Sequence, residues 1–436
     1  MNLEGLTKHP SGRALPADDP AALDEHSLME PEIQVSPFEY YRAMRHFDPV
    51  HYDEKAGMFF VSRYEDLLEI IRDPVTYSVG NAWNRTFATG HFDEFKAILQ
   101  RDGGGYFPDA IMTDPPTHTR VRNLLQAAFT PHRIKLLEPK IRKVASDILD
   151  RIAPLGSADG VNDFAVPMTV GIMCEQLGIP LSDGDNMLRW SEAIIAIRSD
   201  QSHDAMLVEA QHYCDLQNYV IERVHERQKH RTEDMISDLI YARNEGDGEP
   251  VLSMDEIISL ARALLVGGLD SISSALSNLL LMIASDENIA GMFEEAAHND
   301  AKLTRFIEES LRIEPPARGL YRAATRDVEL GGTLIPKDSM ICLLYASAND
   351  DEGVFDHPRE FDPNRKNLSR HLTFGGGIHM CIGMHLARMQ IKVAAQEVAR
   401  RLKDIKLAVP AEEIKFVPTL STLSIERLPI TYSERK

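Results

Sequence analysis

Cysteine is scarce in this chain of 436 residues, which contains only Cys174, Cys214, Cys342 and Cys381 and no CxxC pair. This scarcity argues against a disulfide framework or a structural zinc site and favours a reducing compartment. Positive charge is also in deficit, because 47 Lys and Arg residues face 67 Asp and Glu residues and leave a net charge of −20. Nucleic acid and anionic membrane surfaces are therefore disfavoured as main partners.

Long apolar runs are missing as well. The longest charge-free apolar stretch, residues 271–285, is shorter than a membrane span, and the first 20 residues lack the apolar segment of a secretory signal. With 43% hydrophobic and 26% charged residues, the composition is that of a globular protein. We expect a soluble, cytoplasmic protein that needs no membrane.

The pattern of apolar residues predicts a fold that is mainly α with minor β, in the α+β class. Residues 1–30 are polar and are expected to form an N-terminal arm, followed by a single domain over 31–436. Residues 73–116 are predicted to be a long irregular connection, of the kind that is usually functional. The other predicted elements are strands at 50–54 and 58–62, a helix at 64–73, mainly helices over 117–313, strands at 328–336 and 339–345, a loop over 347–380, a helix near 382–402 and short strands over 414–432.

The most informative segment is residues 374–383, with the sequence FGGGIHMCIG. Its three glycines allow backbone conformations that other residues avoid, and a close approach to a flat ligand. Cys381 lies just before a predicted helix, whose positive N-terminal end would stabilise a thiolate. A dinucleotide-binding loop is excluded because Met380 stands where GxGxxG needs glycine, and a nucleophilic pair with His379 is disfavoured. A nucleophile, a buried structural thiol and a metal ligand remain the alternatives for this cysteine.

A long helix is predicted to begin at the capping box Ser253–Glu256 and to continue to about residue 285. Gly267, Gly268 and Asp270 lie in its middle, where each glycine costs about 1 kcal/mol relative to alanine. Such residues predict a functional kink at which a ligand approaches. The alternative is a glycine pair for close helix packing beside a half-exposed aspartate.

Two further pairs share a helix face. Glu309 and Arg312 are three residues apart, and His118 and Arg122 are four apart after two prolines that suit a first helical turn. An exposed surface pair is the ordinary interpretation of Glu309 and Arg312. Two cationic donors aimed in one direction, as in the second pair, suit a ligand with paired carboxylates.

The 374–383 segment resembles the cysteine loop of the cytochrome P450 family, F-x-x-G-x-H/R-x-C-x-G, at every fixed position, and other family motifs follow in order over about residues 35–432. The resemblance implies a cytochrome P450 fold and haem b, with Cys381 as the thiolate ligand of the iron, which favours O–O cleavage. His118, Arg122, Arg322 and His379 would hold the haem propionates. The other cofactor-binding residues implied are Phe374, Gly375 and Gly383.

Residues 265–271 resemble the oxygen-activating segment of bacterial camphor-type hydroxylases. By this resemblance Gly267 and Gly268 leave room for dioxygen, Asp270 gates proton entry, and Ser271 stands where the family usually has threonine. The Glu309–Arg312 pair is implied to be buried and completed by Arg365 in a structural role. The implied pocket is mostly apolar, and its candidate residues are Trp83, Phe87, Ile111, Met112, Leu264, Arg318 and Leu320.

Arg318 is the exception in that pocket, and could bind a substrate carboxylate, be exposed or form a structural ion pair. The resemblance implies a monooxygenase that inserts one oxygen atom from O2 into a terpenoid-, steroid- or aromatic-like molecule. No flavin or iron–sulfur domain is visible, so a ferredoxin and a ferredoxin reductase would supply electrons from NAD(P)H. The alternatives are a peroxide-driven peroxygenase and a non-catalytic haem-thiolate carrier or sensor.

Overall fold

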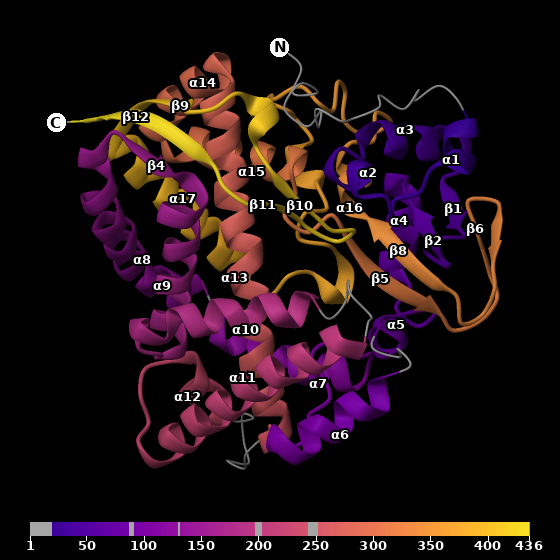
Figure 1. Ribbon diagram of the computed structural model, residues 1–436. Coiled ribbons are helices and arrows are strands. Elements are labelled where there is room, and N and C mark those ends of the chain that lie inside the picture. The colour runs from indigo at the N-terminus through magenta and orange to yellow at the C-terminus, as the bar shows by residue number, and fades with distance from the viewer. Residues whose placement is uncertain (1–19, 87–90, 130, 197–202, 243–251, 436) are drawn as a thin grey trace. The chain divides into compact units, whose positions relative to one another are not determined.

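The computed structural model describes residues 20–86, 91–129, 131–196, 203–242 and 252–435. The chain divides into two compact units (Figure 1). The first unit comprises Met1–Ser78, Ile141–Pro167 and Ser271–Lys436, and the second comprises Val79–Lys140 and Met168–Asp270. Helices predominate and the strands form small sheets, so the predicted mainly α fold with minor β is confirmed.

The second unit is built of helices in the part of the chain that the structure describes. In its middle α11 packs against α6, α10 and α12. Helices that cross from one unit's segment into the other's are α8 (Pro131–Ile152), α9 (Val166–Leu177) and α13 (Met254–Ser285). The helices wholly within the unit are α5 (Val79–Thr86), α6 (Phe92–Asp102), α7 (Thr117–Ala128), α10 (Gly184–Ala196), α11 (His203–Lys229) and α12 (Met235–Ile240).

Helix α13 begins where its capping box predicts. The backbone N–H of Ser253 donates to Glu256 Oε2 at 2.9 Å, and the backbone N–H of Glu256 donates to Ser253 Oγ at 3.2 Å. These reciprocal bonds satisfy two N–H groups that a helix start leaves without partners. The helix then runs for 32 residues without interruption, through Gly267 and Gly268, so the predicted kink does not break its hydrogen bonding.

This helix is long and apolar enough to cross a membrane by length and composition alone, and 61% of its apolar window is buried inside the protein. Burial of that kind is what the core helix of a globular protein shows.

The main sheet of the first unit has five strands in the order β1-β2-β8-β5-β3, with β2 and β8 parallel and the other neighbours antiparallel. Its inward residues, among them Val61, Ile341 and Leu343, form a core with α4 and Phe355. The strands are β1 (Val50–Asp53), β2 (Met58–Val61), β3 (Tyr77–Ser78), β5 (Gly319–Ala324) and β8 (Met340–Leu344).

Three smaller sheets complete the strands of the first unit. Near the C-terminus β12 pairs with both β4 and β9, and the other two sheets are hairpins. Their strands are β4 (Ser157–Asp159), β6 (Val328–Leu330), β7 (Thr333–Ile335), β9 (Leu402–Leu407), β10 (Phe416–Pro418), β11 (Leu423–Ile425) and β12 (Pro429–Glu434).

The remaining helices of the first unit are labelled in Figure 1, where α1–α4 lie near β1 and β2, and α17 contacts β9. Helix α15 starts at Asn299, whose side chain accepts from the backbone N–H groups of Ala301 and Lys302. The helices are α1 (Ala21–Glu25), α2 (Pro31–Val35), α3 (Phe38–Phe47), α4 (Tyr64–Arg72), α14 (Glu287–Ala297), α15 (Asp300–Ile313), α16 (Tyr345–Asn349) and α17 (Met384–Arg401).

Two predictions about the N-terminal third need correction. Residues 1–19 of the expected arm lie outside the described residues, but the rest of it folds back, because Leu23 and Leu28 are buried and α1 forms. The connection 73–116 is not irregular throughout, since it contains α5 and α6. In α6 the buried residues Phe95 and Leu99 are four apart, which places them on one helix face.

Candidate active site

The 374–383 loop packs closely against α4 in the first unit, and its glycines allow this contact. Gly375 and Gly377 have φ angles of +67° and +61°, a region that side chains disfavour. A Cβ atom on Gly377 would lie 2.7 Å from the carbonyl oxygen of Ile71. The backbone N–H of Cys381 donates to the carbonyl oxygen of Phe374 at 2.9 Å and closes the loop. The loop therefore needs glycine for its backbone and for its packing.

Cys381 differs from the other three cysteines in its exposure. Its side chain is exposed, whereas Cys174, Cys214 and Cys342 are buried. Burial raises the pKa of the thiols of Cys174 and Cys214 to about 11, and it also raises the pKa of Cys342. Because the thiolate is the form that binds metals, Cys381 alone of the four is placed to act as a ligand.

A buried ionic cluster lies behind this loop. The Glu309 carboxylate accepts from Arg312 Nε at 2.8 Å and Nη2 at 2.9 Å, with both side chains 0% exposed. Arg365 Nε donates to Glu309 Oε1 at 2.9 Å, and its other nitrogens donate to backbone carbonyl groups. One carboxylate thus faces two guanidinium groups, which is the arrangement that the sequence resemblance implied.

The cluster reaches the cysteine loop through Asn349. Arg312 Nη1 donates to the carbonyl oxygen of Asn349 at 2.8 Å. The Asn349 side chain accepts from the backbone N–H of Leu372 at 2.6 Å and donates to Thr373 Oγ1 at 3.0 Å. The Thr373 hydroxyl donates to the carbonyl oxygen of Leu311. Helix α15 and the start of the loop are therefore joined by buried hydrogen bonds, which are costly to leave unmade.

In the second unit, α7 places His118 and Arg122 one turn apart. His118 is buried, and burial followed by the charge of Arg122 lowers its pKa, against an opposite effect of Asp114. Arg120 projects elsewhere and is exposed, and it forms an ion pair with Glu256. Arg120, which the sequence places on another face of the helix, is thus engaged with Glu256, and the roles of His118 and Arg122 toward the cofactor stay predictions.

The two central glycines of α13 have different surroundings. A Cβ atom on Gly268 would lie 2.6 Å from Met173 Sδ, whereas one on Gly267 would meet nothing within 4 Å. Gly268 thus permits close packing with α9, whereas Gly267 borders open space, and the expectation that both leave room for dioxygen stays a prediction. Asp270 and Ser271 follow, both half-buried.

Comparison with known proteins identifies the chain's relatives. The family model for cytochrome P450 matches residues 78–416. The chain belongs to the cytochrome P450 family.

A putative cytochrome P450, YjiB of Bacillus subtilis (strain 168), is 30% identical over 82% of this chain and 85% of its own. The 6-deoxyerythronolide B hydroxylase of Saccharopolyspora erythraea is 30% identical over 77% of this chain and 82% of its own. The solved structure of CYP109E1 from Bacillus megaterium in complex with testosterone has a TM-score of 0.77 and 26% identity, covering 92% of this chain and 99% of that one. The protein is thus a monooxygenase of this family, which binds haem b.

The described residues fit haem in two respects. An exposed thiol on a glycine-rich loop before α17 is a suitable soft ligand for iron. Arg322 on β5 is buried and donates to the carbonyl oxygen of Tyr321. Burial raises the pKa of Tyr345, and the charge of Arg322 opposes this shift. Tyr345 in turn lies against the loop, because a Cβ atom on Gly375 would be 3.4 Å from its hydroxyl oxygen. Buried Arg322 and half-buried His379 on the loop itself are the two first-unit residues that would hold the propionates.

A second polar cluster lies at the cysteine loop of this cytochrome P450, and the sequence did not predict it. Glu308 on α15 accepts from Arg388 Nε at 2.6 Å and contacts His371 Nε2 at 2.9 Å. Burial raises the pKa of Glu308, but its bonds with His371 and Arg388 outweigh burial and lower the pKa to about 2. Arg388 also lies over the Phe374 ring, 4.6 Å from its centroid.

A weak indication of this cluster exists in the sequence. Glu308 directly precedes the Glu309–Arg312 motif, and His371 lies three residues before Phe374. Nothing in the spacing shows that Arg388, in α17, reaches back to the same carboxylate, since that contact depends on how α15 and α17 pack.

The pocket residues predicted from the sequence have mixed outcomes. Ile111, Met112 and Leu264 are half-buried in the second unit, and Leu320 is half-buried in the first. Phe87 and the side chain of Trp83 lie outside the described residues.

Arg318 is not a pocket residue in the cytochrome P450 structure. It is 1% exposed, it pairs with Glu314 at 3.3 Å and donates to the carbonyl oxygen of Gln34. Its guanidinium also lies 5.8 Å from the centroid of Phe38. Of the three alternatives, the structural ion pair is the one observed, and a role in binding a substrate carboxylate is wrong.

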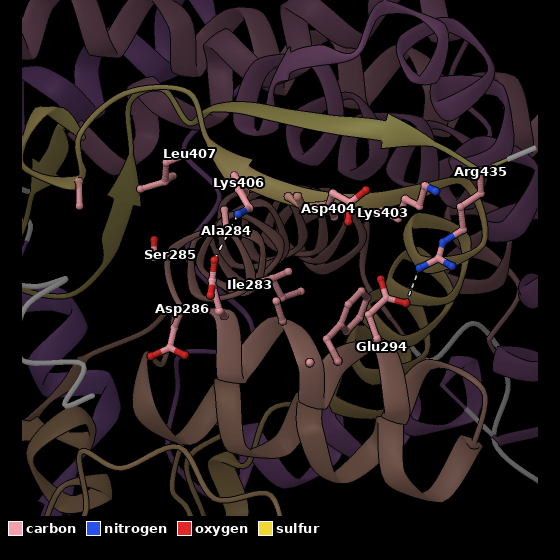
Figure 2. A pocket seen from close by; sticks show the side chains of 16 residues that line it. Ile283, Ala284, Ser285, Asp286, Glu294, Lys403, Asp404, Lys406, Leu407 and Arg435 are labelled. Atoms are coloured by element: carbon pink, nitrogen blue, oxygen red, sulfur yellow. Dashed lines mark hydrogen bonds and ion pairs between the residues drawn. The ribbon is translucent and has the colours of Figure 1, made fainter.

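Figure 2 shows a pocket of about 560 Å³ elsewhere in the first unit, between the end of α13, the start of α14 and strand β9. Its charged residues pair across it, Lys406 with Glu287 at 3.2 Å and Arg435 with Glu294. None of the residues implied by the family resemblance lines it. These two ion pairs involve four of its seven charged residues, and we assign the pocket no part in the oxidation chemistry.

Proposed function

We propose that this cytochrome P450 inserts one oxygen atom from O2 into an apolar small molecule, with electrons that a ferredoxin and its reductase carry from NAD(P)H. The observation that supports this most is the exposed Cys381 thiol on a closed glycine loop. Haem b held there supplies the activation of dioxygen, with a thiolate ligand that favours O–O cleavage.

In this proposal Cys381 ligates the iron, and Phe374, Gly375 and Gly383 shape the ring's surroundings. Arg322 and His379 donate to the propionates from the first unit. His118 and Arg122 supply the same kind of donors from α7. Charge-assisted hydrogen bonds of this sort are about twice as strong as neutral ones, which suits them to retaining an anionic cofactor.

Asp270 and Ser271 are proposed to move protons toward the reacting oxygen. Asp270 takes up protons from solvent, and the Ser271 hydroxyl delivers them. Gly267 keeps space open beside them, since no atom lies within 4 Å of the position of a Cβ there. A side chain at this position would occupy space that a diatomic molecule needs.

The proposed substrate is terpenoid-, steroid- or aromatic-like. The half-buried pocket candidates Ile111, Met112, Leu264 and Leu320 are all apolar, and apolar walls favour apolar ligands. Two relatives agree with a largely apolar substrate, since one is named for hydroxylating 6-deoxyerythronolide B and another was solved with testosterone, which is a steroid. With Arg318 engaged in an ion pair, we expect no preference for a substrate carboxylate at that position.

The protein is proposed to work in the cytoplasm, which agrees with its four free cysteines. An acidic ferredoxin needs a local basic surface on a chain of net charge −20. Arg120 and Arg370 are already paired with Glu256 and Glu65, so Lys366 is the better candidate for this contact. Arg133 is a further basic residue near the segments expected to contact haem, and its side chain lies outside the described residues.

A substrate-panel titration followed by turnover tests the function. Apolar terpenoids, steroids and aromatics should shift the haem from low to high spin, and the best binder should be oxidised with O2, NAD(P)H, ferredoxin and reductase. Oxidation only with hydrogen peroxide would make the protein a peroxygenase. No product under either condition would make it a carrier or sensor, and a spin shift only with highly polar compounds would contradict the proposed substrate class.

A further inference from the structure

Three potential metal ligands meet at one end of α6 and α11 in the second unit. His91 directly precedes α6, Glu94 lies in the first turn of that helix, and His203 is the first residue of α11. Their ligand atoms all lie within 4.8 Å of one another. His203 Nε2 is 3.0 Å from Glu94 Oε2, and the rings of His91 and His203 have centroids 4.8 Å apart.

The donor set is selective in its chemistry. Two imidazoles and one carboxylate suit zinc and neighbouring first-row cations, whereas magnesium and calcium prefer oxygen ligands alone. Metal–ligand bonds of about 2.1 Å in tetrahedral geometry place the ligand atoms about 3.4 Å apart. In the structure these atoms lie within 4.8 Å of one another, so only small side-chain rotations would bring them to that spacing. His91 is half-buried and the other two are exposed, which leaves them free to make these rotations.

Other histidines of the chain show that a simple ion pair does not create such a cluster. His26 pairs with Glu30 at 3.0 Å, and His46 with Glu352 at 2.5 Å. Among the residues that the structure describes, only the group of His91, Glu94 and His203 brings at least three His, Cys, Asp or Glu ligands together in this way.

Because the cluster includes residues of both helices, a cation bound to it would link α6 to α11. Helices α6 and α11 already contact each other further along, where Gln217 Nε2 donates to the carbonyl oxygens of Gly103 at 2.5 Å and Gly105 at 2.6 Å. The Phe95 and Tyr213 rings also meet edge to face, 5.4 Å apart. A metal ion at the cluster would join the two helices at their N-terminal ends as well.

We propose that His91, Glu94 and His203 form a binding site for a divalent transition-metal cation, with Zn²⁺ as the ion it best fits, separate from the haem. Three protein ligands leave the remaining positions to water, as in open zinc sites. The site holds the start of α6 against the start of α11.

The test uses the full-length haem-loaded protein without a polyhistidine tag, so that neither a tag nor a vacant Cys381 competes for zinc. Equilibrium dialysis against ZnCl2, with zinc and iron counted by mass spectrometry, should give one zinc per haem. His91→Ala and His203→Ala should each weaken zinc binding at least about tenfold, since even outer-shell changes cost that much. His26→Ala, which removes a histidine from a pair without a third ligand, should leave zinc binding unchanged.

A second readout guards against a misfolded variant. Each variant must keep the haem absorption and the circular dichroism of the unchanged protein, which we expect because neither side chain is fully buried. The proposal is overturned if the unchanged protein binds zinc no more tightly than the His91→Ala/His203→Ala double variant. Equal weakening by His26→Ala would also overturn it, because binding would then be diffuse.

Discussion

Single buried charges determine how firmly the cysteine loop is held. Glu309 is fully buried between Arg312 and Arg365, and the polar contacts of Arg312 continue through Asn349 to the loop. A buried ion pair adds little net stability against a well-packed apolar replacement, but removal of one partner leaves the other charge uncompensated. Here one carboxylate compensates two cations, so loss of Glu309 leaves two buried charges uncompensated instead of one.

Glu309→Ala should therefore destabilise the protein by about 3–5 kcal/mol and reduce haem retention. Urea unfolding, followed by circular dichroism, measures the first effect, and the ratio of haem absorption to protein measures the second. Glu65→Gln is the matched control, because Glu65 is 69% exposed and its ion pair with Arg370 lies at the surface. If both variants unfolded alike, the buried cluster would have no special structural role.

Ser271 carries the residue-level prediction about chemistry. Its hydroxyl can deliver a proton as threonine does, but serine has more freedom at χ1 and can turn back to the carbonyl group four residues earlier. Ser271→Ala should keep substrate binding and NAD(P)H consumption and divert more electrons to hydrogen peroxide, while Ser271→Thr should couple at least as well as the unchanged enzyme. The measurement is product formed per NAD(P)H consumed, and an unchanged ratio in Ser271→Ala would mean that protons bypass this hydroxyl.

At the residue level, the sequence was informative where a motif fixes spacing. The buried Glu309–Arg312 pair, completed by Arg365, lies as the family pattern implied, while the role of Cys381 as the iron ligand stays a prediction. The role of Arg318 was left open among three alternatives and Glu308 was missed, for one physical reason. Whether a charged side chain faces a ligand or a buried counter-charge depends on tertiary neighbours such as Gln34 and Arg388. The spacing of residues along the sequence does not show which residues become neighbours in the folded protein.

At the scale of elements, replacing each of the two central glycines of α13 by alanine shows whether that glycine serves helix packing or keeps space open for dioxygen. Gly268→Ala should cost about 1–3 kcal/mol, because the new methyl group meets Met173 Sδ at 2.6 Å. Gly267→Ala meets nothing within 4 Å and should gain about 1 kcal/mol of helix propensity in the haem-free protein. We expect Gly267→Ala to lower turnover nonetheless. Thermal unfolding of the haem-free variants and product formation by the haem-loaded ones separate these effects, and a fully active Gly267→Ala enzyme would contradict the access role.

The second element-level prediction concerns the Glu308 cluster, which joins α15, the loop and α17. The folded-state pKa of Glu308, about 2, is below its ordinary value of 4.5. The ionised carboxylate therefore stabilises the fold above about pH 4.5, and this contribution is lost as the pH falls toward 2. The difference in unfolding free energy between the unchanged protein and Glu308→Gln should be largest near pH 6 and shrink toward pH 3. Urea unfolding across that range measures it, and a difference independent of pH would contradict the assigned charge.

The sequence predicted the ends of helices correctly where short-range hydrogen bonds determine those ends. The capping box placed the start of α13 within one residue, because both of its hydrogen bonds are local. Helices α5 and α6 were missed because the glycines and prolines around them suggested irregular backbone, whereas α6 is stabilised by contacts with α11 that sequence spacing does not reveal. The burial of Leu28 in the expected arm has the same origin in tertiary packing.

At the scale of the whole molecule, the cysteine loop, Arg322 and the Glu309 cluster all belong to the first unit. The net charge of −20 is a property of the whole chain, so the proposed docking of an acidic ferredoxin depends on a local basic surface. The family identity fixes the monooxygenase chemistry, while the substrate class depends on apolar side chains whose identities vary freely in such a fold.

The central claim, that Cys381 is the thiolate ligand of the haem, has one direct test. The reduced protein should bind carbon monoxide with the red-shifted Soret band of thiolate ligation, Cys381→His should lose that band while retaining haem, and Cys174→Ala should keep it. If Cys381→Ala gave the same carbon monoxide spectrum as the unchanged protein, another ligand would hold the iron and the assignment of the site would be wrong.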